Sequence, residues 1–263
     1  MTLPDCKTLL LELNKQVLSI TLNRPKKRNA MNSQMVAELG ALFKLLASDL
    51  SVRAVVLRGE GGHFCAGGDI SGMHQDSKQD EQAAIWQFNR SFGHLISKVN
   101  RAPQIVICVL EGSVLGGGFG LACVSDYAIA TSTSRFAMPE TTLGIIPAQI
   151  SPFVVMRIGL TQTRRLSLLG ESINGEQALN LGLIHELSND VDKSISEVLE
   201  KARRCAPQAT ATTKNLILDI AEREQLEKLL DRAADDFSSA LNSVEGREGT
   251  HAFMQKRKPN WAD

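Results

Sequence analysis

The sequence of 263 residues, 43% of them hydrophobic, is long enough to bury a large core in one or two domains. Its 29 basic and 29 acidic residues balance, so no net charge attracts the chain to nucleic acid or to an anionic membrane. No apolar run approaches the ~20 residues of a membrane-spanning helix, and the N-terminus lacks the pattern of a secretion signal. We therefore expect a cytoplasmic globular protein that binds neither nucleic acid nor membrane.

The cysteines and histidines do not form a metal-binding or redox pattern. The five cysteines are an odd number without a Cys-x-x-Cys pair, and the five histidines do not recur at ligand spacing. We expect reduced, structural thiols and no metal site, and we assign no histidine a catalytic role. The cysteines are Cys6, Cys65, Cys108, Cys123 and Cys205.

The first elements along the chain are a hairpin and a helix. β-branched and apolar residues dominate residues 8–22, with a turn at 14–16, and predict two antiparallel strands. Apolar residues then recur at helical spacing from a cap at Asn32 or Ser33 up to Leu50. This part of the chain therefore supplies a strand pair followed by an amphipathic helix.

Strands and helices alternate in the middle of the chain. The predicted elements are a strand at 54–58, a helix within 81–100, a strand at 105–110, a helix near 118–125 and a strand at 127–130. This order predicts an α/β fold with right-handed connections.

Beyond Pro152 the pattern becomes helical, and we expect no further sheet apart from a short strand-like segment at 183–185. The composition changes near residue 190, which divides the chain into a core of residues 1–190 and a helical region of residues 191–263. Helices are predicted at 152–158, 162–169, 175–181, 191–204, 208–223, 225–241 and 244–257.

Two of the predicted strands each lead into a glycine-rich turn. The first turn is Ala66-Gly67-Gly68-Asp69 and the second is Gly116-Gly117-Gly118. Glycine lets a backbone approach a ligand closely, so two backbone N–H groups could bind one oxygen as an oxyanion hole. A P-loop needs a Lys-Ser or Lys-Thr pair that neither turn has, and the dinucleotide-binding pattern is incomplete. The remaining alternative is that the glycines only form tight turns.

Four motifs in order resemble the crotonase (enoyl-CoA hydratase/isomerase) superfamily, and the resemblance covers nearly the whole chain. They are Leu22-Asn23-Arg24-Pro25, the segment from Phe64 to Asp69, the segment from Glu111 to Gly118, and Pro139-Glu140 with Leu143-Gly144. The resemblance implies a spiral of ββα coils, a helical C-terminal region that forms oligomer contacts, and a homotrimer or a hexamer of two trimers. It also implies an acyl-CoA thioester as substrate, with coenzyme A as part of it and no separate cofactor.

The same resemblance assigns the catalytic groups. The backbone N–H groups of Ala66 and Gly117 would hold the thioester oxygen, and Glu140 would be the general acid/base. The residues alone favour a solvated helix or salt-bridge glutamate at Glu140, because most glutamates are solvated, and the motif reverses this preference. Where two-carboxylate hydratases of the family have a second glutamate, this chain has Gly120. Either Glu140 alone activates water and returns the proton, or the enzyme moves a double bond without water.

Three segments, 115–126, 146–149 and 256–262, are most similar to isohexenylglutaconyl-CoA hydratases of acyclic terpene degradation. Such an enzyme hydrates a branched enoyl-CoA that carries a second carboxylate. The alternatives are a 3-methylglutaconyl-CoA hydratase, an enoyl-CoA double-bond isomerase, and a non-enzymatic RNA-binding or scaffold relative. The neutral charge and the retained Glu140 argue against the last of these.

The resemblance also implies where the substrate lies. Coenzyme A would follow the first glycine turn and the basic triplet 26–28, and a neighbouring subunit would reach it through the C-terminus. Gln149 is our candidate for the second carboxylate, although it could instead bond local backbone. Met73, Trp86, Phe88 and Phe119 could form an apolar wall, or simply core. The expected substrate-binding residues are Lys26, Arg28, Ala66, Gly67, Gly68, Asp69, Ile70, Gly116, Gly117, Phe119, Gln149, Phe253 and Lys256.

Overall fold

A computed structural model of the protein describes residues 2–69, 78–221, 243–245, 247–248, 252 and 255–260, without the side chains of 78–85. Its largest element is a six-stranded sheet with the order β1-β2-β3-β4-β6-β9. Only the β1–β2 pair is antiparallel, which confirms the predicted hairpin. The strands are β1 (Leu9–Asn14), β2 (Val17–Leu22), β3 (Ala54–Gly59), β4 (Ile105–Leu110), β6 (Tyr127–Ala130) and β9 (Glu186–Leu187).

A second, smaller sheet is built from three short strands that the sequence analysis did not predict. It has the order β5-β7-β8, with β5 parallel and β8 antiparallel to β7. These strands are β5 (Ser113–Leu115), β7 (Arg135–Ala137) and β8 (Ser172–Asn174). The expectation of no sheet beyond Pro152, apart from the segment at 183–185, was therefore wrong. β8 adds to the sheet there, and the predicted strand lies at β9 instead.

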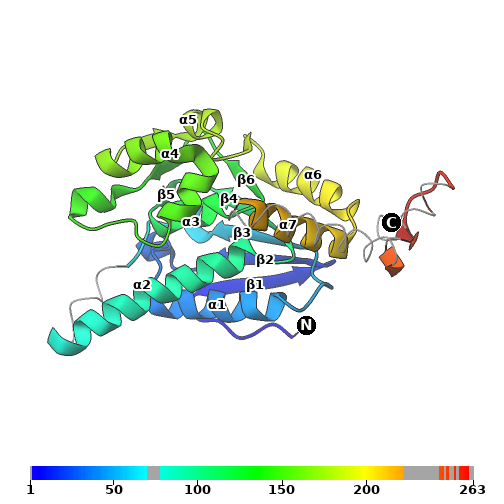
Figure 1. The fold of residues 1–263 in the computed structure, drawn as a ribbon, viewed down its shortest axis with the longest axis horizontal. Coiled ribbons are helices and arrows are strands. Elements are labelled where there is room, and N and C mark those ends of the chain that lie inside the picture. Colours follow the sequence, from blue (N-terminus) through cyan, green and yellow to red (C-terminus); the bar gives the residue numbers. More distant parts are fainter. Residues whose placement is uncertain are drawn as a thin grey trace.

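Helices cover both faces of the main sheet (Figure 1). The helices are α1 (Ser33–Leu46), α2 (Lys78–Asn100), α3 (Gly117–Cys123), α4 (Ser151–Leu169), α5 (Gly175–Asn180), α6 (Val191–Arg203) and α7 (Pro207–Ala221). The predicted cap of α1 is confirmed, because the side chain of Asn32 accepts a hydrogen bond from the Met35 N–H at 3.0 Å. The two helices expected at 152–158 and 162–169 are one helix, α4, interrupted at Gly159 (φ 76°, ψ 161°).

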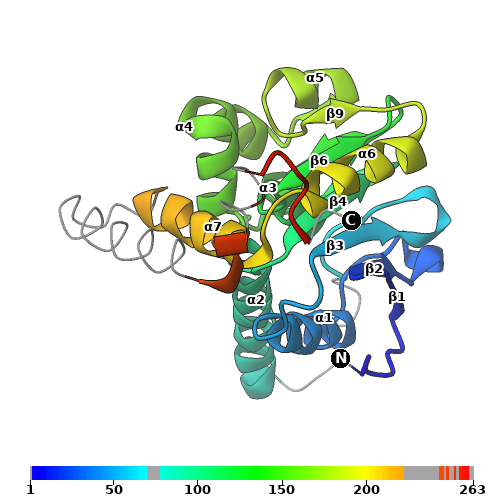
Figure 2. The same cartoon turned by 90° about the vertical axis from the view of Figure 1, so that its right-hand side faces the viewer.

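The core is divided by the alternation of side chains along the strands. Val55 and Leu57 of β3 pack into the large cluster that contains α1 and α2, whereas Val56 between them packs with Val198 of α6. Figure 2 shows α1 and α6 on opposite sides of β3 and β4. Helix α6 thus completes the cover of the sheet that the preceding residues form.

The predicted helix at 225–241 lies outside the described residues, as does most of the one at 244–257. In the part of the chain that is described, no helix is both long enough and apolar enough to span a bilayer.

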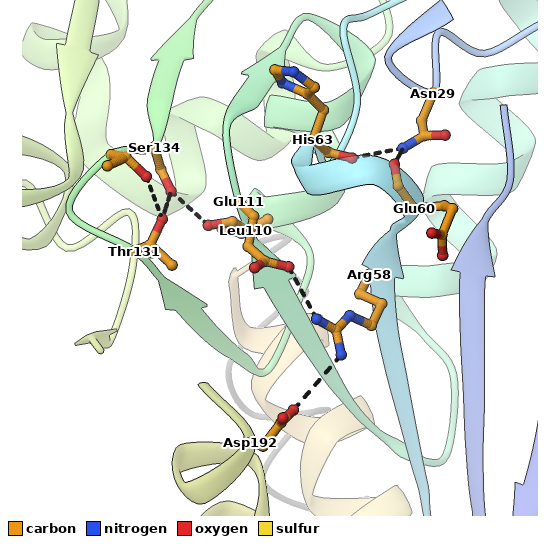
Figure 3. Close-up of polar contacts among 10 residues, drawn as sticks. Asn29, Arg58, Glu60, His63, Leu110, Glu111, Thr131, Ser134 and Asp192 are labelled. Carbon is orange, nitrogen blue, oxygen red and sulfur yellow. Dashed lines mark hydrogen bonds and ion pairs between the residues drawn. The ribbon is translucent and has the colours of Figure 1, made fainter. Parts of the chain in front are cut away.

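Side chains fix the corners where the chain leaves the carboxyl ends of the parallel strands (Figure 3). Beyond β4, the Leu110 carbonyl accepts a hydrogen bond from the Ser134 hydroxyl at 2.7 Å. Arg58 of β3 pairs with Glu111 at 3.2 Å and with Asp192 of α6 at 3.7 Å. These contacts hold the exits of neighbouring strands together, at the edge of the sheet where α/β proteins place their ligands.

Asn29 holds the corner after β3. It is fully buried and has φ 58°, a left-handed conformation that asparagine tolerates. Its side-chain amide donates to the carbonyls of Glu60 at 2.9 Å and His63 at 2.6 Å. Its side-chain oxygen accepts from the Arg24 N–H at 2.8 Å. One side chain therefore ties the loop after β2 to the segment that leads into the first glycine turn.

We predict that Asn29→Ala lowers the free energy of unfolding by about 2–4 kcal/mol, because it removes three hydrogen bonds between a fully buried side chain and the backbone. Urea denaturation followed by circular dichroism measures the change. Asn189→Ala, at an exposed asparagine, is the matched control and should change the free energy by less than about 0.5 kcal/mol. Equal stabilities of the two variants would contradict the assigned role of Asn29.

Candidate active site

The two glycine turns lie against each other, as the sequence analysis expected. The first runs beside β5, with hydrogen bonds from Cys65 N–H to the Ser113 carbonyl and from Leu115 N–H to the Cys65 carbonyl, both 2.9 Å. Gly67 has φ 96° and Gly116 has φ 48°, values that favour glycine. The Gly67 Cα lies 3.5 Å from the position that a Cβ on Gly116 would occupy. The two turns are therefore in van der Waals contact.

The structure corrects the expected hydrogen-bond donor in the first turn. The Ala66 N–H donates to the Arg28 carbonyl at 3.0 Å, so it is not available to a ligand. The Gly67 N–H faces the Cys65 sulfur at 3.3 Å. The Gly68 N–H has no acceptor among the described residues. The available N–H of this turn is therefore that of Gly68, two residues beyond the predicted one.

The second turn keeps its predicted donor. Gly117 is the first residue of α3, where a helix leaves N–H groups unused, and its N–H has no acceptor within the described part of the chain. The Cys65 sulfur lies 3.4 Å from the position of a Cβ on the next residue, Gly118. A Cβ on Gly117 would lie 2.5 Å from the Met31 Cε and 3.2 Å from the Phe92 Cζ, so this turn is enclosed by apolar side chains.

Glu140 lies directly beside this pair of turns. It is the second residue of a short 3-10 helix, η4 (Pro139–Leu143), which follows β7. Its Oε1 is 2.9 Å from the position of a Cβ on Gly116, and its Oε2 is buried without a hydrogen-bond partner. Burial raises the pKa of the Glu140 carboxyl, and a hydrogen bond from its own backbone only partly opposes this. A raised pKa makes this carboxyl better suited than a solvated one to accept and return a proton.

The structure shows what occupies the position of the missing second glutamate. A Cβ on Gly120 would lie 2.4 Å from the Ile150 Cγ2 and 3.0 Å from the Ile96 Cδ1. Apolar side chains from α2 and from the start of α4 therefore fill that space. A side chain at position 120 would require these isoleucines to shift.

The basic triplet lies beside the first glycine turn. Lys26 and Arg28 are exposed, and the chain from Arg28 to Met31 bonds the turn through its backbone. Met31 N–H donates to the Gly67 carbonyl, and Asp69 N–H donates to the Met31 carbonyl, both at 2.8 Å. The exposed cations are thus placed where a phosphate-bearing ligand of this turn would extend.

Asp69 has a partner that the sequence analysis did not find. Its carboxylate pairs with the Arg24 guanidinium at 2.7 Å, and both side chains are largely buried. Arg24 also donates to the Ala30 carbonyl. The pair closes the turn that contains Gly68. The presence of Arg24 in the first family motif was the one signal that pointed to it.

The structure does not bring the remaining predicted substrate-binding residues together at one site. Phe119 is fully buried in the core beneath the second turn. Gln149 donates from its Nε2 to the Asn89 Oδ1 on α2 at 2.9 Å. Lys256 is exposed in a fragment that lies beyond α7, on the side away from α4 (Figure 1). Ile70, Met73 and Phe253 lie outside the described residues.

Three of the cysteines and the histidine His185 lie in buried or partly buried surroundings. All five cysteines are free, and burial raises the pKa of the Cys65 and Cys108 thiols to about 12. Burial and the nearby Arg157 lower the pKa of His185 to about 4, and its Nδ1 accepts the Ala128 N–H at 2.9 Å. Among the described residues, no three histidine, cysteine or acidic side chains are grouped as metal ligands.

A cavity of about 850 Å³ lies apart from this site, between α4, α6 and α7. Its lining includes Cys123, Met156, Ile217 and other mainly apolar residues, but neither Glu140 nor the glycine turns. It therefore belongs to a different surface of the protein. The chemistry described above does not use it.

Known proteins are similar to this chain over nearly its whole length. A sequence model of the enoyl-CoA hydratase/isomerase family matches residues 12–263. The 1,2-epoxyphenylacetyl-CoA isomerase of Escherichia coli (strain K12) is 31% identical over 258 residues, or 96% of this chain and 97% of that protein.

Solved structures of other proteins have the same fold as this chain. An enoyl-CoA hydratase/isomerase from Marinobacter aquaeolei is 52% identical, with a TM-score of 0.93 over 98% of this chain and 100% of its own. Pseudomonas aeruginosa AtuE is 53% identical, with a TM-score of 0.92 over the same shares. These matches confirm the predicted crotonase-like fold with a helical C-terminal region. The chain belongs to the enoyl-CoA hydratase/isomerase family of the crotonase superfamily.

Proposed function

We propose that this protein hydrates a branched α,β-unsaturated acyl-CoA that carries a second carboxylate, with isohexenylglutaconyl-CoA as the substrate. The observation that carries the chemistry is the buried, unpartnered carboxylate of Glu140 beside two unused backbone N–H groups, those of Gly68 and Gly117. Negative charge that forms on a thioester oxygen between these N–H groups would be stabilised as in an oxyanion hole.

The reaction needs one carboxylate in this scheme. Glu140 takes a proton from water as the water oxygen bonds to the β-carbon, and the double-bond electrons move onto the thioester oxygen. The N–H groups of Gly68 and Gly117 hold the resulting enolate. Protonated Glu140 then gives its proton to the α-carbon, which restores the thioester and the free carboxylate. Its raised pKa suits both transfers.

A second candidate function is double-bond isomerisation. Ile150 and Ile96 occupy the space where a second carboxylate would hold water, which favours a reaction without water. Glu140 would then remove a proton from one carbon of the acyl chain and return it to another. The same oxyanion hole would stabilise the same kind of enolate.

The proposed substrate rests on the similarity of three segments to isohexenylglutaconyl-CoA hydratases and on the side chains near them. Gln149 belongs to one of these segments and contacts Asn89 of α2. The loop before it exposes Ile145 and Ile146, and α2 exposes Trp86. Apolar and amide groups together suit a branched hydrocarbon chain with a polar end.

We also propose that the chain assembles into a trimer or a pair of trimers. Exposed apolar side chains on α4 and α7 support this, because monomers rarely expose such residues in groups. They include Met156, Leu160, Ile217 and Ile220, each at least 46% exposed. Two of them line the cavity between these helices. Assembly would bring Lys256 of one subunit towards the coenzyme A of another.

The reaction itself is tested with an α,β-unsaturated CoA thioester in water labelled with heavy oxygen. We predict a hydroxyacyl product that carries the label, detected by mass spectrometry. Glu140→Gln should lower the rate by about 10²–10⁴-fold, the usual contribution of a general acid/base, while circular dichroism stays unchanged. An unlabelled product with a moved double bond would establish isomerisation instead. Full activity of Glu140→Gln would refute both candidates.

We predict that Glu140→Gln stabilises the protein, and more so at higher pH. Burial raises the pKa of Glu140 in the folded state, so the folded protein binds this proton more tightly than the unfolded chain. The wild type therefore loses stability as pH rises from the unfolded pKa through the folded one. Glu140→Gln has no titrating group at this position, so its stability does not fall with pH for this reason. Melting temperatures from pH 4 to 8 should show a gap that widens with pH, and a constant gap would contradict the prediction.

The role of the Gly68 N–H is tested with a pair of substitutions. An alanine Cβ at this position would have its nearest neighbour, the Phe88 Cε1, at 4.0 Å, and φ lies outside the left-handed region. We predict that Gly68→Ala keeps most of the activity, whereas Gly68→Pro, which removes the N–H, loses about 10²–10³-fold in kcat. Both variants should bind coenzyme A. Equal activity of the two folded variants would exclude this N–H from catalysis.

A further inference from the structure

A polar cluster formed by Asn89 and Arg90 of α2 and by Gln149 lies next to the active site. The side chains of Phe88, Phe92 and Ile96 face the catalytic region. Phe88 lies 4.0 Å from a Cβ position on Gly68, Phe92 lies 3.2 Å from one on Gly117, and Ile96 lies 3.0 Å from one on Gly120. Asn89, Arg90 and Gly93 occupy the intervening positions, which point to another side of the helix. The cluster adjoins the catalytic region through Gln149, because the next residue, Ile150, has its Cγ2 2.4 Å from the Cβ position on Gly120.

The side chains of Gln149 and Arg90 pack over Gly93. A Cβ on Gly93 would lie 1.9 Å from the Oε1 of Gln149 and 2.7 Å from the Nη1 of Arg90. The amide and the guanidinium therefore occupy the space above a helix position that lacks a side chain. Gln149 is also anchored by its hydrogen bond to Asn89, at 2.9 Å. Two polar groups from separate parts of the chain are packed together here.

Arg90 has no counter-charge among the described residues. It makes no ion pair and no hydrogen bond within the part of the chain that the structure describes. Its side chain is neither buried nor fully exposed. A guanidinium offers five donors in a planar fork that matches a carboxylate. None of these donors has an acceptor among the described residues, and the guanidinium lies near the anchored amide of Gln149.

The surroundings of the cluster are apolar and open. Trp86, one helix turn before Arg90, is 66% exposed. Ile146, three residues before Gln149, is 73% exposed. An acyl chain with a hydrocarbon branch could contact these side chains while a terminal anion reached the guanidinium. Burial of that anion under a hydrocarbon chain would strengthen the pairing.

We propose that Arg90, steadied by Gln149 over Gly93, binds the second carboxylate of the acyl group and so selects dicarboxylic acyl-CoA substrates. This inference rests on the proposed function, because it assigns a specificity residue to the same site. It goes further than that proposal in naming the cation. It also explains why position 93 has no side chain.

Binding tests the proposal independently of turnover. Glutaryl-CoA and butyryl-CoA are saturated thioesters that differ in the terminal carboxylate, and isothermal titration calorimetry measures their Kd values. Arg90→Met keeps the aliphatic stem and should weaken glutaryl-CoA binding by about 10–100-fold, the range for a charge-assisted hydrogen bond. Butyryl-CoA binding should change less than twofold. Arg90→Lys should restore part of the difference, because it returns the charge without the fork.

Two further variants complete the design. Gly93→Ala places a methyl group where Gln149 and Arg90 lie, so it should also weaken glutaryl-CoA binding selectively. Arg164→Met, at an exposed arginine on α4, removes the same charge elsewhere and should leave both Kd values unchanged. If Arg90→Met weakens both thioesters equally, or neither, the inference is wrong.

Turnover separates this inference from the proposed function. 3-Methylglutaconyl-CoA and 3-methylcrotonyl-CoA differ in the same carboxylate, and we expect the wild type to prefer the first. Arg90→Met should remove that preference through KM rather than kcat. Hydration of both thioesters with no effect of Arg90→Met would overturn the inference and leave the hydratase assignment intact. Selective glutaryl-CoA binding without any hydration or isomerisation would overturn the proposed function and support the carboxylate site.

Discussion

The close contact of two glycine turns is the constraint on which the rest of the site depends. Gly67 and Gly116 approach so closely that a Cβ on either would meet the other turn, at 3.9 Å and 3.5 Å. This contact places the N–H of Gly68 and the N–H of Gly117 on neighbouring segments. It also leaves the space in which the Glu140 carboxylate lies beside Gly116. Glycine is favoured at both positions by their positive φ values, and at Gly116 also by the Glu140 Oε1, which lies 2.9 Å from a Cβ position there.

The remaining architecture keeps that contact in place. The parallel strands β3 and β4 deliver the two turns to the same end of the main sheet, and the small second sheet locks the first turn against β5. Buried polar groups fix the corners, with Asn29 behind the first turn and the Arg24–Asp69 pair beside it. Hydrogen bonds that orient backbone in this way prepare donors before the substrate arrives.

Glu140 shows how the site opposes stability. A buried carboxylate oxygen without a partner is unfavourable for the folded state, and the raised pKa of Glu140 expresses the same effect. The neighbouring turn is enclosed by the apolar side chains of Met31 and Phe92. The surrounding core supports a group whose reactivity depends on its being poorly solvated.

The sequence alone determined the hairpin, the helix capped by Asn32, the main parallel strands and the presence of two glycine turns, because periodicity and turn residues are local signals. It also identified Glu140 through its motif. Tertiary structure decided the small second sheet, whose strands of three residues form only by pairing with distant segments. It decided that Ala66 N–H is used by Arg28 and Gly68 N–H is not, and that isoleucines fill the place beside Gly120. Which donor is left unpaired depends on contacts between residues far apart in the chain, and no local pattern records them.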